Sequence, residues 1–141
     1  MTDEQSNQIQ FEIEPWKRIL YHLMDENTHL KNRLGEVLKI KFDKKYLEKA
    51  EQFQGHFIKF DTQIMILRNQ LADVHTMVVQ KMNAPDETKK IIHSLKIRRK
   101  GTELTQKEFN KLRQEFICFL VKIFNTDSVL EDEVIRADTL Q

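Results

Sequence analysis

A chain of 141 residues with only three glycines and two prolines lacks the turn-forming residues that an all-β or α/β domain of this size requires. Charged residues make up 32% of the chain, which is typical of long solvated helices, and the formal net charge of +1 excludes a global field that would steer it towards nucleic acid or a membrane. The single cysteine, Cys118, excludes an intramolecular disulfide bond and fits a reducing compartment.

Residues 1–12 form an acidic segment without a base, and we expect them to be disordered ahead of a bundle domain at residues 13–125. Pro15 suits a first helical turn, because the N–H group that proline lacks would have no helical partner there. Apolar residues alternately four and three apart then predict a helix with a coiled-coil seam. These positions are Trp16, Leu20, Leu23, Asn27, Leu30, Leu34 and Val37. Asn27 interrupts the seam, either as a register-fixing polar residue or as a tolerated residue at the edge.

A second helix is predicted from Asp43, an N-cap candidate, to about Met82, with Pro85 preventing its continuation. Ten positions in strict four-three alternation are all apolar, which is the strongest signal in the sequence. They are Tyr46, Ala50, Phe53, Phe57, Phe60, Ile64, Leu67, Leu71, Val74 and Val78.

A third helix is predicted from about residue 87 to residue 124, with a seam that is apolar at both ends and polar in the middle. Gly101 allows an alternative, in which this helix ends at Lys100 and a fourth helix begins at a capping box, Thr105 to Glu108. We favour continuity, because the two halves keep one heptad phase. The predicted fold is all-α: an antiparallel three-helix coiled-coil-like bundle, with four helices if the third breaks at Gly101.

Short loops place sequential helices antiparallel, and this predicts which seam residues meet. Phe60 should lie beside Phe109, Phe53 beside Phe116, and Leu30 near Phe53. A first helix of about 25 residues would leave the far half of the second helix without cover. We therefore expect self-association, or binding of another helical protein, through an apolar surface in that half. This surface comprises Leu71, Val74, Met77, Val78, Val79, Met82, Ile91, Ile92 and Leu95.

Histidines and carboxylates on the first two helices make a candidate metal site. His22, Glu26 and His29 share one helix face, and the predicted hairpin brings His56 and Asp61 to the same level. The spacings resemble those of hemerythrin-type and di-iron bundles, which implies a carboxylate–histidine metal-binding bundle as an alternative function. The sequence lacks the His-x-x-x-His element of hemerythrins and a second Glu-x-x-His motif. We therefore expect ordinary surface pairs and no metal or other cofactor.

A run of bases in the third helix suggests a second alternative, binding to nucleic acid or to an anionic surface. The bases are Lys89, Lys90, Lys96, Arg98, Arg99 and Lys100, and no acid lies between them. No aromatic residue interleaves with these bases to stack on nucleobases, so we do not expect nucleic acid as a partner.

Residues 126–141 form an acidic C-terminal tail, in which Val129–Ile135 fit one short helix. Residues 1–10 lack an apolar signal core, and the longest apolar run, near residues 116–121, is far shorter than a membrane helix. We therefore expect a cytoplasmic protein without a membrane partner.

The sequence also lacks signs of catalysis. Cys118 has only Lys122 as a nearby cation, and no nucleophile–base or phosphate-loop motif occurs. We therefore expect no enzymatic activity.

The segment Glu26–Leu38, followed by residues 53–71, resembles a group of short uncharacterised bacterial helical-bundle proteins without an assigned function. The resemblance covers the first two predicted helices and implies a helical bundle but no activity. The sequence as a whole predicts a non-enzymatic helical protein-interaction or scaffolding module that self-associates.

Overall fold

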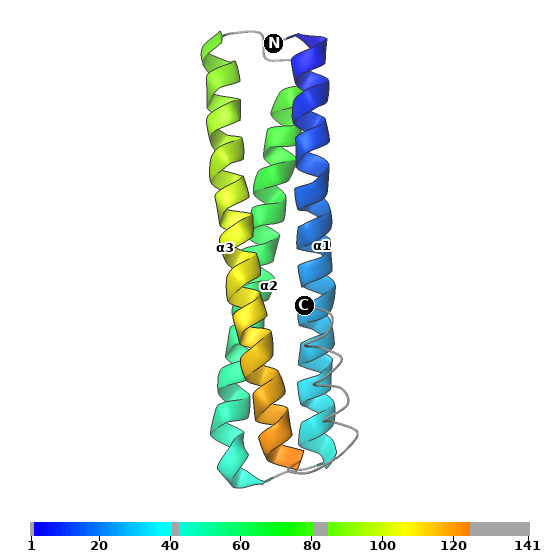
Figure 1. Cartoon of the computed structure of the whole chain (residues 1–141), viewed down its shortest axis with the longest axis vertical. Coiled ribbons are helices and arrows are strands. Elements are labelled where there is room, and N and C mark those ends of the chain that lie inside the picture. The colour runs from blue at the N-terminus through cyan, green and yellow to red at the C-terminus, as the bar shows by residue number, and fades with distance from the viewer. Residues whose placement is uncertain (1, 41–42, 81–84, 125–141) are drawn as a thin grey trace.

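Three long helices make up the protein in a computed structural model, which describes residues 2–40, 43–80 and 85–124. Helix α1 spans Asp3–Ile40, α2 spans Lys44–Val79 and α3 spans Pro85–Phe124. They lie side by side as a rod, with α2 antiparallel to both α1 and α3 (Figure 1). Because no strand occurs among the described residues, the predicted all-α antiparallel three-helix bundle is confirmed.

The first helix begins at Asp3 and not near Pro15, so the expectation that residues 1–12 are disordered is wrong from Asp3 onwards. A reciprocal capping box starts the helix. The Gln5 N–H donates to Thr2 Oγ1 at 3.1 Å, and the Thr2 N–H donates to Gln5 Oε1 at 3.0 Å. These bonds satisfy two backbone donors that have no partner at a free helix end.

The additional N-terminal turns of α1 cover the far half of α2. Ser6, Ile9 and Ile13 are buried, because they continue the four-three seam towards the N-terminus. Ser6 Oγ donates to the carbonyl oxygen of Val78 at 3.4 Å. An interior proline such as Pro15 costs about 3 kcal/mol, and burial of two isoleucines, at about 1.5–3 kcal/mol each, offsets that cost. The expectation that the first helix leaves this half uncovered is therefore wrong.

Helix α3 runs through Gly101 without a break, so the four-helix alternative is wrong. A Cβ atom at Gly101 would lie 3.1 Å from Cδ2 of Leu67, and the absence of a side chain there lets α3 pass close to α2. The polar middle of the α3 seam is buried at Thr102 and Thr105. The Thr102 hydroxyl donates to the carbonyl oxygen of Arg98 at 2.9 Å, so its burial leaves no donor unpaired.

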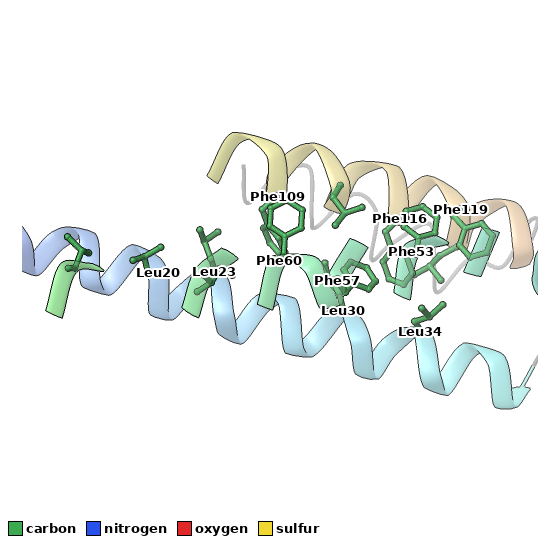
Figure 2. Close-up of a cluster of buried hydrophobic side chains, with 14 of the residues drawn as sticks. Leu20, Leu23, Leu30, Leu34, Phe53, Phe57, Phe60, Phe109, Phe116 and Phe119 are labelled. Carbon is green, nitrogen blue, oxygen red and sulfur yellow. The ribbon is translucent and has the colours of Figure 1, made fainter. Parts of the chain in front are cut away.

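Phenylalanine rings of α2 and α3 fill the core in the other half of the rod, with leucines of α1 closing the third side (Figure 2). The ring centroids of Phe60 and Phe109 are 5.6 Å apart, and those of Phe53 and Phe116 are 5.3 Å apart. Both pairs confirm the predicted antiparallel register. Phe116 also meets Phe57 edge-on at 5.1 Å, a geometry worth about 0.5–1.5 kcal/mol beyond the buried area.

The N-terminus of α2 is capped as predicted. Asp43 has an extended backbone conformation, and its side chain accepts a hydrogen bond from the Lys45 N–H at 3.2 Å. The helix ends at Val79, with Gln80 as its C-cap, whereas the predicted end at Met82 lies outside the described residues.

Candidate functional site: a groove between α1 and α3

Asn27 is fully buried at the centre of the contact between α1 and α2. Its Nδ2 atom donates to the carbonyl oxygen of Phe57 at 2.8 Å and to Asp61 Oδ1 at 2.7 Å. The other carboxylate oxygen of Asp61 accepts a hydrogen bond from Lys31 Nζ. Because these bonds form only in one register, the geometry supports the register-fixing interpretation of Asn27 over the edge interpretation.

Glu26, one of the candidate metal ligands, joins α1 to α3. Arg113 Nη1 donates to the two oxygens of this carboxylate at 3.1 and 3.3 Å. His22 lies 3.4 Å from the same carboxylate, with 70% of its side chain exposed. No motif in the sequence pointed to Arg113 as the partner of Glu26.

The remaining candidate ligands lie apart from one another. His29 and His56 are exposed, and Asp61 pairs with the lysine and asparagine of the central contact. Within the described ranges, no three His, Cys, Asp or Glu side chains come together as metal ligands would. The structure thus does not bring His22, Glu26, His29, His56 and Asp61 into one ligand set.

The apolar surface predicted for self-association lies largely inside the core. Its buried residues are Leu71, Val74, Val78, Ile91 and Leu95. Met77, Val79 and Ile92 are exposed, and Met82 lies outside the described residues. The N-terminal turns of α1 cover this part of α2 and α3, so five of the nine residues are buried within the chain itself. Self-association through the exposed residues of the set stays a prediction.

The bases of α3 differ in exposure and in partners. Lys89, Lys90, Lys96, Arg99 and Lys100 are exposed. Arg98 is half-buried, and its Nε atom finds no hydrogen-bond partner in the described part of the chain. Arg99 Nε lies 3.9 Å from a carboxylate oxygen of Glu103. Of the six bases, Lys96 and Arg99 line a common hollow.

This hollow is a groove of about 380 Å³ between the N-terminal halves of α1 and α3, which run parallel (Figure 1). We call it the α1–α3 groove. It is lined by Gln5, Gln8, Ile9, Glu12, Trp16, Thr88, Ile92, Leu95, Lys96 and Arg99. These positions recur at helical spacing, so each wall is one face of one helix. Trp16 is half-buried and Ile92 is 44% exposed, so the groove presents apolar surface that the described helices leave uncovered.

Opposite charges lie on the two walls of the α1–α3 groove. Lys96 and Arg99 extend from the α3 wall, and Glu12 from the α1 wall. No histidine, cysteine or serine is among the described residues that line it. An apolar floor between charged walls can hold an amphipathic segment by burial and by ion pairs.

Comparison of the chain with protein families, with characterised proteins and with solved structures finds no match. None of the described helices is both long and apolar enough to cross a membrane. The resemblance to bacterial helical-bundle proteins stays a prediction.

Proposed function

We propose that this chain is a non-enzymatic protein-interaction module whose α1–α3 groove binds an amphipathic helix of a partner protein. The observation that carries the proposal is the groove itself, with an apolar floor between two walls of opposite charge. A helix lying there would complete a four-helix arrangement with α1, α2 and α3, a common solution for burying apolar faces of helices.

The charges of the groove specify which helix fits. Lys96 and Arg99 are three residues apart on one face of α3, so they can meet carboxylates on successive turns of a bound helix. Glu12 on the facing wall favours a lysine or arginine on the other side of that helix. The partner segment therefore has an apolar stripe with acidic residues on its α3 side, and Ile92 supplies an exposed apolar contact.

The test uses Trp16, the only tryptophan of the chain, as a reporter inside the groove. The probe is a designed amphipathic peptide of about three heptads, with leucine on the apolar stripe and glutamate beside it. A matched peptide carries lysine in place of glutamate. We expect the glutamate peptide to change Trp16 fluorescence saturably and the lysine peptide to bind at least about tenfold more weakly.

Variants of the groove make the test specific. The double variant Lys96→Glu, Arg99→Glu should reverse the preference in favour of the lysine peptide, and Ile92→Glu should weaken both peptides. Lys100→Glu is the matched control, because Lys100 is an exposed base of α3 that does not line the groove. Absence of a fluorescence response to either peptide, or a preference that charge reversal does not change, would contradict the proposal.

A further inference from the structure

Helix α2 carries a second heptad stripe on the face turned away from the core. It consists of Ile58, Thr62, Met65, Asn69, Ala72, Thr76 and Val79, and we call it the outer seam. All seven residues are exposed, and their steps alternate four and three. None of them is charged, although about two of seven would be at the chain's 32% frequency of charged residues. This composition is typical of a helix-packing face and not of a solvated one.

The apolar residues and the threonines of the outer seam can lose their hydration at little cost. Its large apolar side chains are more than half exposed: Ile58 at 54%, Met65 at 56% and Val79 at 55%. The hydroxyl groups of Thr62 and Thr76 donate to carbonyl oxygens one turn earlier in α2, at 3.4 and 3.0 Å. These hydroxyls keep their hydrogen bonds when the seam is covered, so burying them leaves no donor unpaired.

The outer seam matches itself when it is read backwards from Asn69. Thr62 and Thr76 lie seven residues on either side of Asn69, and Met65 and Ala72 lie four before and three after it. If two copies of α2 pair antiparallel, Asn69 faces its equivalent and each Met65 faces an Ala72. A parallel pair would set Met65 against Met65 and Ala72 against Ala72. The two methionines would then crowd each other, and the two alanines would leave a void between the helices.

A hollow lies beside the outer seam, between α2 and α1. It measures about 340 Å³ and is lined by Met65, Asn69 and Ala72 of the outer seam, together with Lys17, Tyr21 and Arg68. The Arg68 guanidinium carbon stands 4.2 Å from the centre of the Tyr21 ring. This stacking holds Arg68 against α1. A methionine is flexible enough to fill an irregular hollow of this kind, and Met65 of a second copy would enter it beside Ala72.

We propose that two copies of this chain pair antiparallel through the outer seam, about a two-fold axis at Asn69. The proposal adds a second copy to the partners of the interaction function proposed above and uses a surface separate from the α1–α3 groove. The pairing is isologous, so each contact occurs twice. The two Asn69 amides fix the register, as a polar residue at a seam position does in coiled coils.

The area of the outer seam places the pairing among small interfaces. From Ile58 to Val79 it spans about 33 Å at 1.5 Å per residue, and a contact strip about 10 Å wide on each copy buries about 660 Å² in total. Specific interfaces of standard size bury about 1,200–2,000 Å². The dimer is therefore of the weak, transient kind and dissociates on dilution.

The first test measures the mass of the full chain by sedimentation equilibrium from about 1 to 300 µM. We expect a reversible monomer–dimer equilibrium for the wild type and at least a tenfold weaker one for Met65→Glu. Met77→Glu is the matched control, because Met77 is an exposed methionine of α2 outside the outer seam. A wild type that stays monomeric, or a Met65→Glu variant that dimerises like it, would overturn the proposal.

The second test determines the orientation by disulfide formation in a Cys118→Ser background. Mixed Met65→Cys and Ala72→Cys chains should form a heterodisulfide faster than either variant alone forms a homodisulfide. A faster Met65→Cys homodisulfide would overturn the antiparallel arrangement. Met65→Glu should leave the Trp16 fluorescence change on peptide binding unaltered. The test of the dimer and the test of peptide binding in the α1–α3 groove can therefore fail independently.

Discussion

The three glycines of the chain lie inside helices, and their alanine variants test the packing of α3 against α2. A glycine in a helix interior costs about 0.5–1 kcal/mol relative to alanine. Apart from its chain neighbours and its own helix backbone, a Cβ atom at Gly35 or Gly55 would find no atom of the described residues within 4 Å, whereas one at Gly101 would lie 3.1 Å from Leu67 Cδ2. The same substitution should therefore have different effects at open and packed positions.

We expect Gly55→Ala to raise the free energy of unfolding by about 0.8 kcal/mol, because it gains helix propensity without a clash. Gly35→Ala should gain somewhat less, about 0.5 kcal/mol, since helix ends such as the one near Ile40 fray. Gly101→Ala should change the free energy of unfolding by less than about 0.4 kcal/mol. Its gain in helix propensity is offset because the half-buried Leu67 side chain must shift to accept the methyl group. Gly101→Leu, which overfills the contact, should lose about 1–3 kcal/mol.

Urea unfolding followed by circular dichroism at 222 nm measures these differences, at about 2 µM protein so that association does not contribute. The dependence of the free energy on urea should be the same in all variants. If Gly101→Ala stabilised the protein as much as Gly55→Ala, or if Gly101→Leu were neutral, the close approach of α3 to α2 at Leu67 would be refuted.

Three further substitutions test the buried polar contact, the aromatic core and the early start of α1. Asn27→Leu should raise the free energy of unfolding, measured by urea titration, by about 1 kcal/mol. The substitution removes a buried amide whose Oδ1 finds no partner among the described residues, and Asp61, which loses this partner, stays partly exposed to water. Phe116→Ala should lower it by about 3–5 kcal/mol, since this ring is fully buried against the phenylalanines of α2, and calorimetry should show the loss as a lower Tm. Pro15→Ala should stabilise the chain by up to about 3 kcal/mol and slow amide exchange near Phe11. The alanine has a backbone N–H group, which can donate the helical hydrogen bond to the carbonyl oxygen of Phe11 that proline cannot make.

The heptad spacing of α2 and α3 was sufficient to predict most of the fold. An antiparallel hairpin has few allowed registers, so aligning the two seams placed Phe60 beside Phe109 and Phe53 beside Phe116, as the structure shows. The start of α1 was mispredicted although its signal was present. Ile9 continues the four-three spacing towards the N-terminus, but the acidic composition of the segment and the helix-start preference of Pro15 both favoured a later start.

The α1–α3 groove could not be predicted from hairpin pairing, because α1 and α3 are parallel and not joined by one short loop. Their relative register depends on how both helices pack on α2, and sequence spacing alone does not fix it. The ion pair between Glu26 and Arg113 was unpredictable for the same reason. The four-three spacing of the outer seam is present in the sequence of α2. More than half of its residues are polar or small, however, so it does not stand out as an apolar stripe.

The two proposed surfaces are compatible, and together they predict a bivalent scaffold. The outer seam lies on the face of α2 turned away from the core, whereas the α1–α3 groove is built from the other two helices. A dimer through α2 therefore keeps both grooves open on its two sides. Linking two bound segments converts the second binding event into an intramolecular one and can raise avidity by about 10²–10⁴ when the linker spans the sites.

We therefore expect two glutamate peptides joined by a flexible Gly/Ser linker to bind the wild type more tightly than the single peptide at protein concentrations above the dimer dissociation constant. The advantage should vanish in Met65→Glu, whose groove is intact but whose dimer is weakened, and should persist in the control Met77→Glu. Calorimetric titration of the three proteins with the single and the linked peptide measures both the affinity and the number of sites. An equal gain from linking in Met65→Glu and in the wild type would show that the avidity does not come from the α2 dimer.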